Sequence, residues 1–373
     1  MSAQPLLPLE DALRILQGSF PAPATPEVRA DRDDPALDLS SMDGAALRSA
    51  DGVSPRRILG TLYAGDAPAL AVEPGTCVRI MTGAAVPPGA DAVVPVEELE
   101  LREGFLAPLR APRAGENIRV RAGQARAGDL LLPGGGPDSA ARVGLLAQVG
   151  LPVPPRTRVK VGVVATGDEL RADPAPHQIR DSNGPMLEAL AHALGGDVCR
   201  LPALPDRPEA VRAFLEDLGE VQILLTSGGV SAGEKDHLPA VLRDMGARIL
   251  FHKIRLKPGK PMLTAHLDGR VILGLPGNPV SSYINALMFL PVAMAGLQGR
   301  RAPDPWKDGV LAGSVPNPGD RPLLHPCRRE GGSLHPLPSR GSADLVRLAQ
   351  ADAFAWVPEG GHPGGPVSYL DVI

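Results

Sequence analysis

The stretch Val159-Lys-Val-Gly-Val-Val-Ala165, followed at once by Thr166-Gly-Asp-Glu169, decides the fold that we predict for this chain. It is a continuous apolar run of strand length, which is typical of a parallel strand buried on both faces of a sheet. Beyond it, strands alternate with helices, and this order predicts a parallel, twisted α/β sheet with helices on both faces. The further strands are expected at 197–201, 221–226, 248–254, 262–267 and 271–275, and the helices at 185–194, 208–218, 237–245 and 279–290.

The rest of the chain has a different pattern, in which short β-prone pieces are cut by Gly and Pro. Such spacing favours small β modules. A length of 373 residues allows several domains. The predicted fold class is therefore multidomain α/β plus β, with a small β module before the central parallel α/β domain and a C-terminal β domain. The expected domains are a helical and extended linker domain (1–45 and 133–155), a small β domain (46–132), the α/β domain (156–298) and the C-terminal β domain (299–373).

Composition excludes several classes of partner. The formal net charge of −4 gives no reason to expect nucleic acid or an acidic membrane surface. Cys77, Cys199 and Cys327 are far apart, so we expect buried small side chains in a reducing compartment. No Cys/His zinc pattern and no secretion signal is found, and the longest apolar run, 286–297, is too short to span a bilayer. A cytoplasmic location is predicted.

The stretch Lys257-Pro258-Gly259-Lys260 brings two ammonium groups together. Pro and Gly suit the second and third positions of a type II turn, whose end residues lie within about 7 Å at Cα. Like charges about 4 Å apart repel by roughly 4 kcal/mol at an effective dielectric near 20, and a bound dianion would reverse that sign. The alternative is an ordinary surface turn whose lysines point apart into water.

Three further loops follow strands of the predicted sheet, at 166–169, 227–236 and 275–282. Ligands of such sheets lie outside the carboxyl ends of the strands, so we expect these loops to meet at one edge. Asn278 is placed to cap a helix that begins at Pro279. The free N–H groups of Val280, Ser281 and Ser282 would then point out of the helix as an anion site.

Acidic side chains in the same loops, namely Asp168, Glu169, Glu234 and Asp236, would repel an anion unless a cation lies between them. Oxygen ligands beside a phosphate suit Mg²⁺. Other interpretations stay open: Asp236 as a helix cap, Glu169 as a solvated charge and Gly228-Gly229 as a plain turn. The chain contains neither a P-loop nor a G-x-G-x-x-G motif.

At these residues the chain resembles the molybdopterin molybdenumtransferase family, which includes the E domain of gephyrin. The C-terminal part agrees more loosely, at Gly341-Ser342 and Ala351-Asp352. The matching stretches are Ser41-Met-Asp-Gly44, Arg79 to Pro95, Gly115-Glu-Asn-Ile-Arg119, Thr166-Gly-Asp-Glu-Leu170, Asp181-Ser-Asn183, Thr226 to Asp236, Lys257-Pro-Gly-Lys-Pro261 and Leu275-Pro-Gly-Asn-Pro-Val-Ser281.

The resemblance implies an Mg²⁺-assisted transferase that inserts molybdate into adenylated molybdopterin and releases AMP in molybdenum cofactor biosynthesis. It implies a homodimer whose active cleft is completed by the partner subunit, and other proteins of this biosynthesis as further partners. The catalytic residues it implies are Asp43, Glu169, Asp236, Lys257 and Lys260, and the metal ligands Glu169, Asp206 and Asp236. The adenylate and pterin would contact Thr166, Gly167, Asp168, Ser227, Gly228, Gly229, Ser231, Pro276, Gly277, Asn278, Pro279 and Ser281.

The chain departs from the family pattern at three positions. Gln124 stands where the family commonly has an acid, Ala45 where an aromatic residue is usual, and Arg207 where a second acid is common. These departures support an alternative, a catalytically impaired molybdopterin-binding carrier or scaffold. A third hypothesis is a nucleotide-acting enzyme, such as an adenylyltransferase, built on the same α/β domain.

Overall fold

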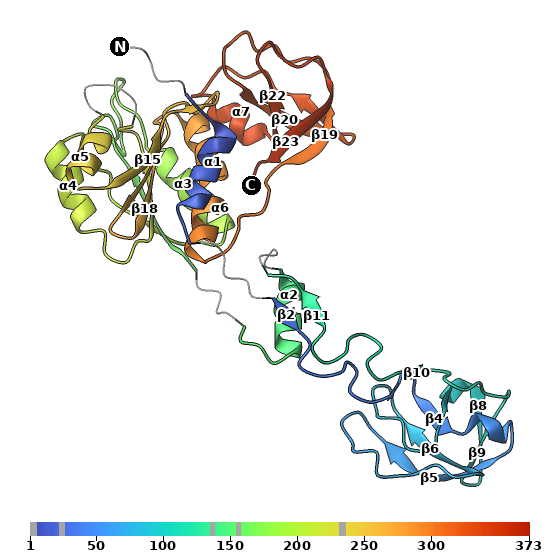
Figure 1. The fold of residues 1–373 in the computed structure, drawn as a ribbon. Helices are drawn as coiled ribbons and strands as arrows, with labels where there is room; N and C mark the ends of the chain where they lie inside the picture. The colour runs from blue at the N-terminus through green and yellow to red at the C-terminus, as the bar shows by residue number, and fades with distance from the viewer. Residues whose placement is uncertain (1–5, 22–26, 135–138, 154–157, 231–235) are drawn as a thin grey trace. The chain divides into compact units, whose positions relative to one another are not determined.

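The computed structural model describes residues 6–21, 27–134, 139–153, 158–230 and 236–373. The chain divides into two compact units. Unit 1 comprises Met1–Ala24 and Pro155–Ile373, and unit 2 comprises Thr25–Pro154. Each unit is described by itself (Figure 1).

Unit 1 is built on a six-stranded sheet with the order β13-β12-β14-β18-β17-β15. The first four strands are parallel, which confirms the predicted central parallel α/β domain. Strand β17 is antiparallel to both of its neighbours, β18 and β15. A two-residue turn joins β17 to β18, in which Asp268 and Gly269 have positive φ of 48° and 78°. The bounds are β12 Lys160–Ala165, β13 Asp197–Arg200, β14 Ile223–Ser227, β15 Arg248–His252, β17 Leu263–Leu267 and β18 Arg270–Leu275.

Helices cover both faces of this sheet (Figure 1). Successive strand residues point to opposite faces, so Ile223 and Leu225 of β14 join one core cluster while Leu224 joins the other. The first cluster includes side chains of α3 (Asn183–Ala193) and α6 (Pro279–Leu297). The second includes those of α4 (Pro208–Glu216) and α5 (Leu238–Asp244). The four predicted helices are thus present, with shifts of one or two residues at the ends of α3, α4 and α5.

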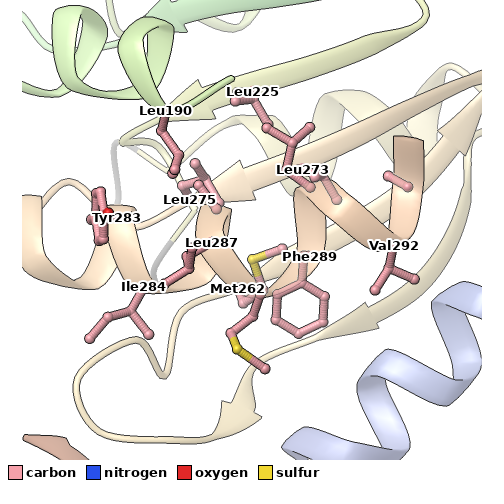
Figure 2. Packing of buried hydrophobic residues seen from close by; sticks show 14 of the residues in the cluster. Leu190, Leu225, Met262, Leu273, Leu275, Tyr283, Ile284, Leu287, Phe289 and Val292 are labelled. Atoms are coloured by element: carbon pink, nitrogen blue, oxygen red, sulfur yellow. The ribbon is translucent and has the colours of Figure 1, made fainter. Parts of the chain in front are cut away.

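Helix α6 is longer than predicted. We expected it over 279–290, but it continues through Pro291 to Leu297. Proline removes one helical hydrogen bond, and burial of Val292, Ala293 and Met294 in the core offsets that loss. Figure 2 shows its side chains, such as Tyr283 and Phe289, packed among Leu190, Leu225 and Leu273. Length and composition alone would allow α6 to cross a membrane, yet 89% of its apolar stretch is buried inside the protein, as in a core helix.

The N-terminal helix α1 (Leu9–Gly18) also belongs to unit 1. Leu9, Ala12 and Leu16 recur at helical spacing and are buried in the same cluster as α6. Just before the helix, β1 (Leu7–Pro8) pairs with β16 (Ile254–Arg255). The prediction grouped residues 1–45 in one linker domain, whereas this helix packs on the α/β core. The domain boundaries themselves stay predictions.

The C-terminal β domain is a closed barrel with the strand order β19-β21-β20-β22-β23. Its own core includes Leu311, Cys327 and Leu334, while Phe354 packs into the core of the α/β sheet. The bounds are β19 Lys307–Leu311, β20 Leu323–Glu330, β21 Ser333–Pro336, α7 Leu345–Gln350, β22 Ala353–Val357 and β23 Gly365–Asp371.

Unit 2 contains a six-stranded sheet with the order β7-β4-β6-β5-β9-β8. Arg56 of this sheet is fully buried and donates hydrogen bonds to the carbonyls of Ser54, Arg48 and Gly52, which closes the loop before β5. The bounds are β2 Val28–Arg29, β3 Leu39–Ser40, β4 Gly44–Leu47, η1 Ser49–Asp51, β5 Arg56–Leu62, β6 Thr76–Ile80, β7 Ala92–Pro95, η2 Val96–Glu98, β8 Leu99–Arg102, β9 Phe105–Pro108, β10 Ile118–Arg119, β11 Leu130–Leu132 and α2 Ala140–Gln148.

All three cysteines carry free thiols. Cys77 and Cys327 are buried as expected, and burial raises the pKa of each thiol to about 11. The prediction is wrong for Cys199, which is exposed because β13 is an edge strand of the sheet.

Candidate active site

The main cavity of unit 1 has a volume of about 970 Å³. One wall comes from the loops that follow β12, β14 and β18, which the sequence predicted to meet at one edge of the sheet. The other wall comes from the barrel domain and includes Arg321, His325 and Ser342. Nine of the predicted site residues line it: Glu169, Gly229, Asp236, Lys257, Lys260, Pro276, Gly277, Asn278 and Ser281.

The two predicted lysines line this cavity together, but the predicted type II turn is wrong. Lys257 instead pairs as a β-bridge with Leu323 of the barrel. Its N–H donates to the carbonyl of Pro322 at 2.9 Å, and its carbonyl accepts from the N–H of Leu324 at 2.8 Å. The peptide bond between Lys257 and Pro258 is cis. The barrel strand therefore fixes the backbone from which the first lysine projects.

A buried side chain on α6 fixes the middle of the same segment. Asn285 is fully buried, and its Nδ2 donates to the carbonyl of Gly259 at 3.0 Å. Gly259 has a φ of 122°, and a Cβ there would lie only 2.7 Å from Asn285 Oδ1. The position therefore requires glycine. Sequence reasoning missed Asn285, although an amide inside an otherwise apolar helix was a usable signal.

A second buried amide joins two of the strand-end loops. Asn183, at the start of α3, donates from Nδ2 to Ser227 Oγ at 2.6 Å and to the carbonyl of Gly277 at 2.7 Å. Thr166 adds a backbone bond, because its N–H donates to the carbonyl of Ser227 at 2.9 Å. Of the predicted binding residues, Thr166, Gly167, Asp168, Ser227, Gly228 and Pro279 do not line the main cavity. Thr166 and Ser227 hold its loops in place instead.

The predicted anion site at the start of α6 is wrong for two of its three N–H groups, those of Val280 and Ser282. Asn278 occupies the N-cap position, but its side chain donates to Ser342 Oγ at 2.9 Å rather than capping the helix. The N–H of Val280 donates to the carbonyl of Ser342 at 3.0 Å, and that of Ser282 to the carbonyl of Asn278 at 2.9 Å. The two bonds to Ser342 tie the helix start to the barrel, whereas the bond of Ser282 lies within the helix, so the N–H groups of Val280 and Ser282 are already used.

The barrel wall adds a cation and an imidazole that sequence reasoning missed. Arg321 projects from the loop before β20, and its Nη1 donates to the carbonyl of Leu256 at 2.9 Å. Its Nε also lies 3.6 Å from Asp320 Oδ1, and the N–H groups outside these two contacts can bind a ligand. His325 lies in the same wall, where burial lowers the pKa of its imidazole. The cavity thus joins two ammonium groups and one guanidinium to a neutral imidazole.

The acidic residues divide between two places. Glu169 and Asp236 line the main cavity. Asp206 lines a small neighbouring cavity with Thr166, and its N–H lies 3.4 Å from Asp168 Oδ1. No cluster of three His, Cys, Asp or Glu side chains able to hold a metal exists among the described residues. Glu169 and Asp236 nevertheless fit Mg²⁺, which typically takes one or two carboxylates together with water and substrate oxygens.

Two predicted site residues cannot be placed at this cavity. Ser231 lies outside the described residues. Asp43 belongs to unit 2, where its Oδ1 accepts hydrogen bonds from the N–H and hydroxyl of Thr82, both at 2.7 Å. These bonds lower the pKa of Asp43, so its carboxylate is ionised at neutral pH.

The structure also describes the environment of the three residues that depart from the family pattern. In the amide orientation that satisfies both partners, Gln124 donates to Asp34 Oδ2 at 3.1 Å and accepts from Arg119 Nη2 at 2.7 Å. Ala45 is fully buried in β4. Arg207 is exposed immediately before α4.

Comparison with known proteins agrees with this architecture. Three family models match: the MoeA N-terminal region (domain I and II) at residues 12–150, a probable molybdopterin binding domain at 162–295 and the MoeA C-terminal region (domain IV) at 308–372. The molybdopterin molybdenumtransferase of Bacillus subtilis is 33% identical over 357 residues, 90% of this chain and 83% of the relative. The chain belongs to the molybdopterin molybdenumtransferase family.

Other members of the family show the same relation. The molybdopterin molybdenumtransferase of Synechococcus elongatus is 34% identical, over 94% of this chain and 89% of its own. The solved structure of a molybdopterin biosynthesis MoeA protein from Pyrococcus horikosii matches with a TM-score of 0.73 and 25% identity, covering 98% of this chain and 99% of that one. Both the resemblance drawn from the motifs and the predicted fold class are confirmed.

Proposed function

We propose that this chain is a molybdopterin molybdenumtransferase that inserts molybdate into adenylated molybdopterin and releases AMP. Family membership supports the reaction class. The observation that carries the proposal is the grouping of Lys257, Lys260 and Arg321 around one cavity of about 970 Å³. A cavity of this size suits a substrate as large as a nucleotide-linked pterin.

The cationic groups account for recognition of the oxyanion. Molybdate is a tetrahedral dianion, and charge-assisted hydrogen bonds from ammonium and guanidinium groups are about twice as strong as neutral ones. Lys257 and Lys260 approach from the α/β side and Arg321 from the barrel side. A dianion between them relieves the repulsion among the three cations, so the same charges that oppose each other in the free protein favour binding.

Glu169 and Asp236 would hold Mg²⁺, whose contribution is to neutralise charge on the phosphate oxygens as AMP leaves. Both carboxylates line the cavity that contains the lysines. Asp206, the third predicted ligand, would act through the neighbouring loop rather than from this cavity. The walls at Gly229, Pro276, Gly277, Asn278 and Ser281 would contact the adenylate and pterin.

We further propose a cytoplasmic homodimer in which Asp43 serves the cleft of the partner subunit, and transient partners among other proteins of molybdenum cofactor biosynthesis. The ionised state of the Asp43 carboxylate supports such a role. Sedimentation of the purified chain tests the dimer. Mixing Asp43→Asn chains with Lys260→Ala chains tests the shared cleft, because a mixed dimer would contain one intact site.

Purified chain, adenylated molybdopterin, Mg²⁺ and molybdate test the reaction itself. We expect AMP release that depends on molybdate. Tight molybdopterin binding without AMP release would favour the alternative carrier or scaffold, and recovery of turnover in Gln124→Asp would then identify Gln124 as the cause. Consumption of ATP or a dinucleotide without molybdate would favour the third hypothesis.

A further inference from the structure

A second cavity of unit 1, of about 600 Å³, lies beside the proposed active site and shares no lining residue with it. The segment 169–180 separates the two cavities. Within it, Leu170 and Ile179 form a β-bridge, and the N–H of Arg171 donates to the carbonyl of Ile179 at 2.9 Å. Glu169 and Ile179 line the main cavity, whereas Leu170, Arg171 and Arg180 line the second.

The charged groups of this second cavity are Arg171, Arg180, Arg200 and Asp181. Both oxygens of the single carboxylate, that of Asp181, already accept hydrogen bonds. Asp181 Oδ1 accepts from the N–H of Gly184 at 2.8 Å, and Oδ2 accepts from Arg200 Nη2 at 3.1 Å. Three guanidinium groups against one carboxylate leave two positive charges in excess.

The remaining two guanidinium groups are held by backbone carbonyls. Arg171 donates from Nη1 to the carbonyl of Leu170 at 2.6 Å, and Arg180 from Nε to the carbonyl of Ala172 at 3.2 Å. Neither makes an ion pair with a described residue. A guanidinium has five N–H donors in a fixed fork, so each keeps a free edge with which to bind an anion.

We propose that this cavity binds the phosphate group of an organic phosphate monoester. A phosphate monoester carries a charge of about −1.5 to −2 at neutral pH, which matches the excess of positive charge. The bidentate geometry of arginine suits phosphate oxygens. The cavity is larger than phosphate alone, and Leu201, Pro202 and Ala203 offer an apolar wall for the organic part of the ligand.

The proposed phosphate site does not depend on the proposed reaction. Its ligand can come from one of two sources, and the experiment distinguishes them. The phosphate ester is either the AMP that the proposed reaction releases or a cellular organic phosphate that has no part in it. AMP that binds tighter than ribose 5-phosphate indicates the first source, and equal binding indicates the second. Each result supports a phosphate monoester site.

Isothermal titration calorimetry with AMP and with ribose 5-phosphate tests the site. All titrations use the Lys260→Ala background, which weakens anion binding in the main cavity. Adding Arg171→Gln and Arg180→Gln should weaken binding about 100-fold, because two charge-assisted contacts are lost. Adding Arg328→Gln, an exposed arginine of the barrel strand β20, is the matched control and should leave the affinity unchanged.

Two results would overturn the proposal: affinity that is unchanged by the Arg171/Arg180 pair of substitutions, or the absence of any binding in the Lys260→Ala background. Circular dichroism and thermal melting of each variant confirm that the chain is folded. AMP release is assayed separately, with the chain that carries none of these substitutions. Failure of the proposed reaction is therefore measured by that assay, and failure of the phosphate site by the titrations.

Discussion

The lining residues of one wall of the main cavity could be predicted from the sequence, and most of those of the other wall could not. Most of the α/β wall consists of loops that directly follow apolar strands, and these loops were predicted to meet because of that position. The lysine segment was predicted from its two charges, and the roles of single residues from the family resemblance. The barrel wall contributes Arg321, His325 and Ser342, about 60 to 80 residues further along the chain than the lysine segment. A loose family match marked Ser342, but no local pattern marked Arg321 or His325. Loops at strand ends can thus be assigned to a site from the sequence near them. The residues of an opposing wall cannot, because they reach the site only through packing between domains.

The first prediction tests whether the α/β wall carries most of the anion binding. Replacing Lys257 and Lys260 together by Ala should lower kcat/KM by about 1,000-fold, because two charge-assisted contacts to the dianion are lost. AMP release at varied molybdate concentration measures the effect. Lys253→Ala is the control, since Lys253 does not line the cavity. Activity close to that of the unaltered chain in the double variant would refute the assignment.

The second prediction tests whether the barrel wall takes part or merely closes the cavity. Arg321→Ala should lower kcat/KM by about 100-fold, chiefly through a higher KM for molybdate. Arg321→Lys should recover part of that loss, because it restores the charge without the planar fork. The control is Arg328→Ala. If the barrel wall closes the cavity without binding the anion, Arg321→Ala and Arg328→Ala will have the same kinetics.

The fold was predictable where one local pattern sufficed. The apolar strand at 159–165 and the strand-helix alternation after it predicted the α/β domain, since burial on both faces leaves a strong compositional signal. The end of α6 was not predictable, because Pro291 is a local stop signal that burial of the last turns overrides. The conformation of the lysine segment was also missed, since its bridge to Leu323 depends on contact with the barrel.

The third prediction concerns the tether that positions the lysines. Asn285→Ala removes the donor to the Gly259 carbonyl and should lower kcat/KM by about 10-fold and stability by about 1–3 kcal/mol. Ser282→Ala is a matched control on the same helix, because Ser282 is equally buried and its hydroxyl has no hydrogen-bond partner in the described chain. Urea unfolding and molybdate kinetics separate the two effects. Identical losses in both variants would mean that Asn285 acts only through the core.

The fourth and smallest expected effect is the pH dependence contributed by the barrel wall. Burial lowers the pKa of His325 below its usual value near 6.5. Between the folded and unfolded pKa values the unfolded chain binds more protons, so stability falls as pH falls through that window and is unaffected above it. His325→Gln should therefore flatten the unfolding free energy between pH 7 and pH 5, while His335→Gln, on an exposed position of the same barrel, should not. An equal slope in the unaltered chain and in His325→Gln would show that the imidazole has the same pKa in the folded and unfolded chain, and would contradict the lowering of that pKa by burial.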